Sequence, residues 1–535
     1  MATITCDYIV IGGGSGACAV AGRLSEQTDV HVTVLEAGGT GDSMVVKTPM
    51  GCVAMLPTKL NNWAFETIPQ PGLNGRRGYQ PRGKMLGGSS GLNAMVYVRG
   101  HRNDYDHWAA LGNTGWSYDE VLPYFIKSEN NTQFGAPYHG QSGPLHVDNL
   151  VSDNPIQQLF LQGAEQAGFK LNRDFNGAEQ EGLGVYQVTQ YLGERWSAAR
   201  AYLQPHQVKQ RQLQIETHCL VTKILFEGKR AIGVEYTQGG QRKTMHARCE
   251  VILAAGALQS PQLLMLSGVG DAAALQAMGI PVVHHLPGVG QNLQDHPDFV
   301  FKYRAKSLDL LGVSAAGSLR VGREVWRYHK QRRGMLSSNG AECGGFLKTD
   351  STLSAPDIQL HLVMAMLDDH ARKLHLGHGF SCHVCLLRPK SVGELRLADT
   401  KPTSAPLINP RFLEHDDDLE TLVKGFKLTR QLMDTPVFKA LRTEDFETAD
   451  VHTDDDIRAK LRDKCDTIYH PVGTCKMGQD AMAVVNAQLQ VHGLERLRIV
   501  DASIMPSLIG GNTNAPTMMI GEKAADMIKA DRARL

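Results

Sequence analysis

The first forty residues alternate between short apolar runs and glycine-rich breaks. Residues 8–11 form a β-branched apolar run that ends in glycines 12–14, and residues 17–24 then place small residues at helical spacing. A second apolar run follows and ends in Glu36, 24 residues after Gly12. Such runs indicate buried strands, and the segment between them indicates a helix. The pattern predicts a strand, a tight turn, a helix and a second parallel strand.

Other patterns predict elements in the second half of the chain. Residues 357–364 and 393–397 alternate apolar and polar positions, as expected for strands with one covered face. Three aspartates precede the lysines in residues 415–427, which is typical of a capped surface helix rather than a metal site. Cys382 and Cys385 form the only CxxC, but in a strand they face opposite sides, so we expect buried structural cysteines and no metal.

Composition excludes several classes of protein. The chain has 535 residues, enough for two or more domains, and its 55 basic residues equal its 55 acidic ones. No excess charge therefore points to nucleic acid or to an acidic membrane surface. Ten cysteines without a framework spacing fit reduced thiols. Because no secretory signal or membrane-spanning run is visible, we expect a cytoplasmic protein, with peripheral membrane association left open.

The glycines near the N-terminus predict a dinucleotide site. Gly12 allows a tight turn, Gly14 lets a pyrophosphate approach the backbone, and the following helix offers N–H groups to its negative charge. Glu36 is placed to accept the ribose hydroxyls. Ala17 occupies the third position of the fingerprint, while Gly16 lies one place early. This motif alone does not distinguish NAD from FAD.

A second cluster of glycine and serine occupies residues 81–95 and is followed by Val-Tyr-Val-Arg-Gly. Such a loop lets backbone amides and small hydroxyls lie against an anionic or planar ligand. Here the sequence resembles the glucose-methanol-choline (GMC) family of FAD-dependent oxidoreductases. The resemblance extends from residue 6 to about residue 527 and is closest to the bacterial alcohol and choline dehydrogenase branch. It is carried by residues 62–65, 83–106, 255–270, 288–297, 469–474, 500–506 and 511–517.

The resemblance implies an α/β (α+β) fold of two interleaved domains. A Rossmann-like FAD-binding domain is expected from residues 1–155, 192–305 and 460–535. A substrate-binding domain, built on an antiparallel sheet covered by helices, is expected from residues 156–191 and 306–459. Because nucleotide-binding motifs occur near both ends and in the middle of the chain, the first domain must be assembled from separated segments.

His470 is the candidate catalytic base. Pro471 biases it toward a strand end or a loop, and histidine has the unperturbed pKa best suited to accept a proton near neutral pH. The resembled family pairs such a histidine with a second histidine or an asparagine, which implies Asn514, 44 positions later. Asn514 would hold the substrate oxygen while hydride passes to flavin N5. Its alternative role is that of a turn residue.

The resemblance also implies which residues hold the cofactor. Some members attach FAD to a histidine at the position of Leu92, so here we expect noncovalent FAD. His296 is expected to stabilise a loop rather than to serve the site. The predicted cofactor-binding residues are Gly12, Gly14, Ser15, Glu36, Ala37, Trp63, Arg82, Gly87, Gly88, Ser89, Asn93, Ala94, Val96, Val221, Ala255, Asp501, Ala502, Asn512 and Thr517.

These features predict an FAD-dependent dehydrogenase that oxidises a primary alcohol to an aldehyde. Aliphatic alcohols, polyether alcohols such as polyethylene glycol, and aromatic alcohols are the substrate candidates. Choline is a weaker one, because residues 306–459 show no aromatic or acidic cage for its cation. The expected partner is an electron acceptor such as a quinone, a cytochrome or a dye. The alternatives are an oxidase of the same family that forms hydrogen peroxide, or a lyase or noncatalytic flavin-binding member.

Overall fold

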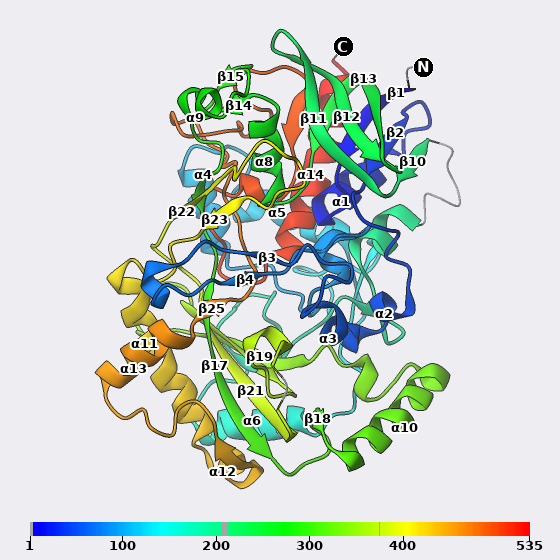
Figure 1. The fold of residues 1–535 in the computed structure, drawn as a ribbon. Helices are drawn as coiled ribbons and strands as arrows, with labels where there is room; N and C mark the ends of the chain where they lie inside the picture. Colours follow the sequence, from blue (N-terminus) through cyan, green and yellow to red (C-terminus); the bar gives the residue numbers. More distant parts are fainter. Residues whose placement is uncertain (1–3, 205–211, 374, 535) are drawn as a thin grey trace.

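The computed structural model describes residues 4–204, 212–373 and 375–534. Two sheets organise the chain: one in the upper half of the molecule in Figure 1, the other in the lower half. Each sheet has its own hydrophobic core. Both chain ends lie beside the upper sheet (Figure 1), so segments distant in sequence build it together.

The upper sheet is a parallel nucleotide-binding sheet extended by an antiparallel ribbon. Its order is β10-β2-β1-β13, with β26 also paired to β13, and all these pairs are parallel. β11 and β12 continue it from β13 in antiparallel register. The strands are β1 (Ile4–Ile11), β2 (Val32–Leu35), β10 (Leu213–Glu216), β11 (Cys219–Glu227), β12 (Arg230–Gln238), β13 (Gln241–Leu253) and β26 (Leu497–Ile499).

Helix α1 (Ser15–Leu24) follows β1 directly, as predicted, and packs against α14 (Asn514–Arg532). Glycines make this contact close. A Cβ on Gly16 would lie 2.3 Å from the carbonyl oxygen of Val500, and one on Gly521 would lie 2.6 Å from that of Gly16. Gly16 therefore serves helix packing, which places the start of α14 beside the turn after β1.

The lower sheet is antiparallel, in the order β24-β17-β21-β20-β19-β7, with β18 beside β21 and β25 beside β17. Helices α6 (Ile156–Gln166), α11 (Asp416–Met433), α12 (Pro436–Leu441) and α13 (Asp454–Lys464) lie around it (Figure 1). The strands are β7 (Gly182–Val185), β17 (Pro297–Ala305), β18 (Gly312–Val313), β19 (Ala341–Leu347), β20 (Ile358–Val363), β21 (Gly377–Leu386), β24 (Arg442–Asp445) and β25 (Asp466–Thr467).

The predicted local elements form, with one correction. The pattern at 357–364 forms β20, and that at 393–397 forms β22 (Gly393–Arg396). Only β22 has one covered face, because every residue of β20 is buried between its neighbouring strands and both faces of the sheet. α11 begins at Asp416, where the His415 ring accepts the backbone N–H of Asp417. Both cysteines of the CxxC are buried in β21, and all ten cysteines are free.

The strand pairing departs from the predicted domain ranges in two segments. β17 pairs within the antiparallel sheet, although residues 297–305 were expected in the FAD domain. Conversely, β22 and β23 (Leu407–Asn409) pair with β16 (Gln291–Leu293), and Leu395 and Ile408 belong to the core of the upper half. The domain ranges as a whole stay a prediction.

The other described elements are short or peripheral. They comprise α2 (Met44–Lys47), η1 (Pro49–Gly51), α3 (Cys52–Met55), β3 (Phe65–Glu66), η2 (Pro71–Leu73), β4 (Tyr79–Gln80), η3 (Gly88–Gly91), α4 (Arg102–Ala110), α5 (Tyr118–Ser128), β5 (Glu129–Asn131), β6 (Leu145–Val147), β8 (Gln190–Tyr191), β9 (Glu194–Arg195), η4 (Ala199–Leu203), α8 (Gln259–Leu266), β14 (Val269–Gly270), α9 (Ala272–Ala277), β15 (His284–His285), α10 (Ala315–Gln331), η5 (Met335–Ser337), η6 (Asp369–Ala371) and η7 (Ala502–Ile504). Over the described ranges, no helix is both long and apolar enough to cross a membrane.

Candidate active site

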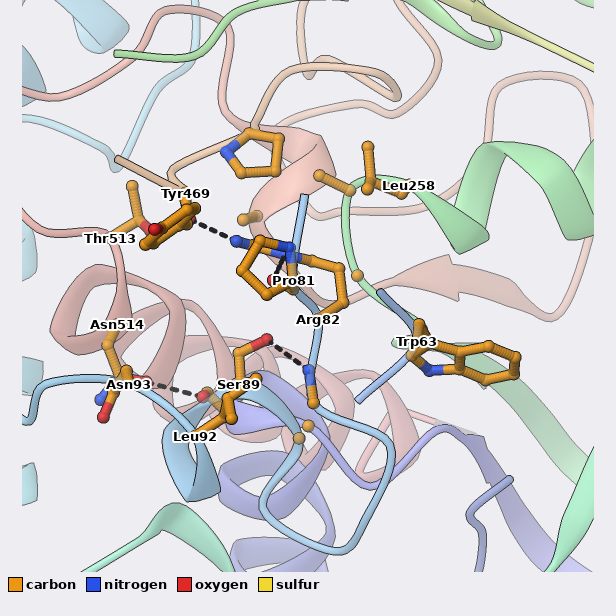
Figure 2. A pocket seen from close by; sticks show the side chains of 18 of the residues that line it. Trp63, Pro81, Arg82, Ser89, Leu92, Asn93, Leu258, Tyr469, Thr513 and Asn514 are labelled. Atoms are coloured by element: carbon orange, nitrogen blue, oxygen red, sulfur yellow. Dashed lines mark hydrogen bonds between the residues drawn. The ribbon is translucent and has the colours of Figure 1, made fainter. Parts of the chain in front are cut away.

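A cavity of about 370 Å³ lies between the two sheets. Its lining comes from the ends of β1 and β13 on one side and from β20 and β21 on the other. Figure 2 shows part of this lining, with Trp63, Arg82 and Tyr469 on separate segments around one space. The predicted nucleotide loop and His470 therefore meet in one cavity.

The turn after β1 forms the nucleotide end of this cavity. Gly12 has a φ of +96°, and a Cβ there would lie 2.6 Å from the carbonyl oxygen of Ala254, so only glycine fits. Glu36 accepts the backbone N–H groups of Gly13 at 2.8 Å and Gly38 at 2.7 Å. Burial raises the pKa of Glu36 to about 7 despite these two bonds.

The second glycine cluster packs directly onto this turn. Gly88 has a φ of +52°, and a Cβ there would lie 2.7 Å from Cα of Gly14. Ser89 Oγ accepts the backbone N–H of Gly83 at 3.1 Å (Figure 2). Buried Arg195, which the sequence did not suggest, donates to the carbonyl oxygen of Asn93 at 2.6 Å and to its Oδ1 at 3.0 Å. Arg195 thus stabilises the conformation of the loop through these two hydrogen bonds.

All but one of the predicted site residues line the cavity. The exception is Gly87, whose N–H donates to the carbonyl oxygen of Gly13 at 2.7 Å and which has a φ of +91°. Gly87 therefore stabilises the conformation of the loop without contributing to the cavity wall. The individual contacts of the others with a cofactor stay predictions.

His470 lies at the other end of the cavity, in the loop after β25, as its proline predicted. Its backbone N–H donates to Asp295 Oδ1 at 2.8 Å. Its ring contacts two side chains: Nδ1 lies 3.0 Å from Nδ1 of His296, and Nε2 lies 3.3 Å from Nδ2 of Asn512. Asp295 holds the loop, while the ring of His296 orients the candidate base.

A chain of hydrogen bonds sets the tautomer of His470. His296 Nε2 lies 3.1 Å from the carbonyl oxygen of Leu387, which only accepts, so this nitrogen carries the proton. His296 Nδ1 is then an acceptor, and Nδ1 of His470 must donate to it. The Nε2 atom of His470 then carries no proton, and its lone pair accepts from the Asn512 NH2 group at 3.3 Å. Gln359 donates to Asn512 Oδ1 at 3.0 Å, which turns the Asn512 NH2 group toward that same atom.

Electrostatics keep His470 neutral. Burial lowers its pKa well below the ordinary value, and His296, His361 and Arg82 act in the same direction. His296 itself has its pKa lowered to about 3 by burial. The imidazole is therefore in the unprotonated state that a general base needs at neutral pH, while the same lowering of the pKa makes Nε2 a weaker proton acceptor than an ordinary histidine.

Asn514, the predicted partner of His470, makes its side-chain hydrogen bond at the start of α14, and its role toward the substrate stays a prediction. It is the first residue of α14, and its Oδ1 accepts the hydroxyl of Ser15 at 2.7 Å. This bond ties α14 to the nucleotide turn. Both asparagines line the cavity, but the one that contacts His470 is Asn512.

Three further histidines line the cavity, and the sequence did not single them out: His361, His370 and His383. His361 and His383 are directly opposite each other on β20 and β21. His383 Nδ1 lies 2.6 Å from Asp298 Oδ2, while its buried Nε2 has no partner among the described residues. The sequence signal that could have found His361 is the alternation of the predicted strand. In a strand, side chains two positions apart share a face, so His361 lies on the same face as Gln359.

The lining fits FAD. Gly14 has nothing nearer to an added Cβ than the Ala254 carbonyl oxygen at 3.9 Å, so packing does not require glycine there and its open face suits a ligand. The two carboxylates in the described lining, Glu36 and Asp501, are held by backbone N–H groups at the nucleotide end. Leu92, which the sequence resemblance singled out as unable to attach the flavin, is buried in a cluster with Met85 and Met55. The described residues contain no group of three or more side chains able to hold a metal ion.

Comparisons with known proteins agree. The profiles of the GMC oxidoreductase family match residues 6–298 and 389–521. The alcohol dehydrogenase (acceptor) of Pseudomonas putida is 45% identical over 99% of this chain and 97% of its own length. The mitochondrial choline dehydrogenase of Homo sapiens is 43% identical over 98% of this chain and 90% of its own length. A formate oxidase variant from Aspergillus oryzae superposes with a TM-score of 0.92 and 27% identity, over 100% of both chains. The chain belongs to the GMC oxidoreductase family and is an FAD-dependent enzyme that acts on CH–OH groups.

Proposed function

We propose that this enzyme oxidises an uncharged primary alcohol to an aldehyde and passes the electrons to an acceptor other than oxygen. The alcohol dehydrogenase (acceptor) and the choline dehydrogenase, both more than 40% identical, support a dehydrogenase. The observation that carries the proposal is the contact between the Nε2 atom of His470 and the NH2 group of Asn512 at 3.3 Å inside the cavity.

FAD, when bound, supplies the hydride acceptor for this oxidation. His470 accepts the hydroxyl proton at Nε2, because its Nδ1 proton is held by His296. Asn512 donates from Nδ2 to the substrate oxygen and stabilises the charge that develops there. The contacts favour Asn512 over Asn514 for this second role, because the NH2 group of Asn512 lies at Nε2 of His470, whereas the contact of Asn514 is with Ser15.

The lining near His470 favours an uncharged substrate. Leu311, Val363, Ala365 and Leu367 are apolar, and no carboxylate from the described residues lines this end. Trp63 and Tyr469 are the only Trp, Tyr or Phe side chains in the described lining, and two rings on separate segments do not form a cage. A quaternary ammonium would need a carboxylate or an aromatic cage to replace its water shell. Aliphatic, polyether and aromatic alcohols therefore remain candidates, and choline is disfavoured.

Noncovalent attachment of FAD is part of the proposal. Leu92 offers no nucleophile, and its buried side chain lines the cavity and belongs to an apolar cluster with Met85. The loop can then hold the cofactor only by hydrogen bonds and packing.

Anaerobic mixing of the oxidised enzyme with a panel of alcohols tests the proposal. A primary alcohol should bleach the flavin absorbance, and choline should bleach it far more slowly. The reduced flavin should then persist when air is admitted and reoxidise when a dye acceptor is added. Rapid reoxidation by air with hydrogen peroxide formation would instead establish an oxidase, and failure of every alcohol to bleach the flavin would refute alcohol oxidation.

A further inference from the structure

Helix α10 lies at the edge of the molecule (Figure 1) and is mostly exposed. Of its 17 residues, only Gly317, Glu324 and Tyr328 are buried. These three lie along one narrow seam, as their spacing of seven and four requires. The rest of the helix surface is uncovered by the described part of the chain.

The face opposite this seam carries large apolar side chains. Leu319 is 80% exposed and Trp326 is 62% exposed, and their separation of seven residues places them on the same side of the helix. Val325 is 51% exposed, about 100° around the helix from Trp326. Near the start of α10, the bridged residues Val313 and Leu376 are also exposed, at 44% and 76%. Several large apolar side chains exposed on and beside one helix indicate a contact surface.

Basic residues flank the apolar ones. Residues 320–333 contain six Lys and Arg and a single acidic residue, although the whole chain is neutral. Four of the six are paired with carboxylates outside the helix: Arg320 with Asp309 at 2.6 Å, Arg327 and Arg333 with Asp153 at 3.1 and 3.4 Å, and Arg332 with Glu194 at 3.0 Å. The other two, Arg323 and Lys330, have no such partner among the described residues. Arg323 is 73% exposed, with Glu324 at 3.9 Å as its nearest carboxylate, and Lys330 is exposed one turn beyond Trp326.

The helix is fastened close to the reactive end of the cavity. Leu311, four residues before its start, and Asn339, eight residues after its end, both line the cavity. Tyr328 Oη donates to the Gly193 carbonyl oxygen at 3.1 Å, which anchors the buried seam. Both ends of α10 are thus joined by short segments to residues of the cavity lining.

We propose that α10 docks the enzyme on an anionic phospholipid surface, with Leu319 and Trp326 inserted between headgroups and with Arg323 and Lys330 on the phosphates. A basic helix with Trp and Leu on its outward face has the composition of an interfacial helix. A stable protein partner would need about 800 Å² of complementary surface, whereas one protruding helix offers a narrow ridge. This inference is independent of the proposed substrate and acceptor.

Co-sedimentation of the holoenzyme with phosphatidylcholine vesicles, with and without phosphatidylglycerol, tests the proposal. The enzyme should bind the anionic vesicles, and salt should weaken this binding. The double variant Leu319→Glu, Trp326→Glu should bind more than about tenfold more weakly, because two apolar anchors are lost. The control Leu111→Glu alters an exposed leucine after α4, outside α10, and should bind as the wild type does.

A second variant separates docking from folding. Arg323→Glu, Lys330→Glu changes only exposed side chains and should weaken binding by on the order of tenfold, while flavin content and dye-coupled activity stay unchanged. Wild-type enzyme that ignores anionic vesicles, or helix variants that bind them like the wild type, would overturn the proposal. It would also be overturned if sedimentation velocity without lipid showed a dimer that the α10 variants lose, since this face would then join two copies of the chain.

Discussion

Replacing His296 tests whether the hydrogen-bond chain controls the base. In His296→Phe the buried Nδ1–H of His470 loses its acceptor, which the structure places at 3.0 Å. An unsatisfied buried donor costs about 1–3 kcal/mol, so the ring should favour orientations or tautomers that satisfy it elsewhere. At about 1.4 kcal/mol per tenfold, the productive state should become about fivefold to 150-fold rarer. Flavin reduction should slow by the same factor.

The assay is anaerobic stopped-flow reduction of the bound flavin at saturating alcohol. His296→Gln is the matched control, because its amide oxygen can accept from His470 while its NH2 group donates to the Leu387 carbonyl oxygen. The glutamine variant should therefore be faster than the phenylalanine variant. Equal rates for the two variants, or a wild-type rate in His296→Phe with full flavin content, would refute the tautomer argument.

The remaining predictions concern the asparagines and the cofactor. Asn512→Ala should slow flavin reduction by about two to three orders of magnitude while FAD stays bound. Asn514→Ala should mainly weaken FAD binding. Equal effects of the two substitutions on the rate of flavin reduction would contradict this division of roles. In flavin-free protein, burial raises the pKa of Glu36 from 4.5 to about 7, so ionising this carboxyl group opposes folding. The free energy of unfolding should therefore fall by about 3 kcal/mol between pH 4.5 and pH 7. Urea titrations of Glu36→Gln should show no such dependence on pH. Acid precipitation should release all the FAD into the supernatant, and yellow colour retained in the washed pellet would disprove noncovalent attachment through the loop at Leu92.

The nucleotide end of the site could be predicted from the sequence because the backbone conformation there requires glycine at particular positions. Gly12 and Gly88 have positive φ and lie against neighbouring backbone, so few other residues are tolerated. The family, the fold class and FAD followed from such motifs. The alternation at 357–364 and the acidic start of α11 were equally local signals, and both elements formed as predicted.

The reactive end was less predictable because its contacts join distant segments. His361 and His383 meet only through the pairing of β20 with β21, which no local pattern specifies. Asn512 and Asn514 are two positions apart in one turn, and spacing alone does not show which faces His470. The role of His296 depends likewise on the distant carbonyl of Leu387.

The central claim is that His470 removes the alcohol proton while hydride leaves the substrate. The most direct measurement is the anaerobic rate of flavin reduction in His470→Ala, with FAD content confirmed from the absorbance of the purified variant. The account predicts a rate lower by about two to four orders of magnitude with the cofactor still bound. A variant that retains FAD and reduces it at the wild-type rate would contradict the account.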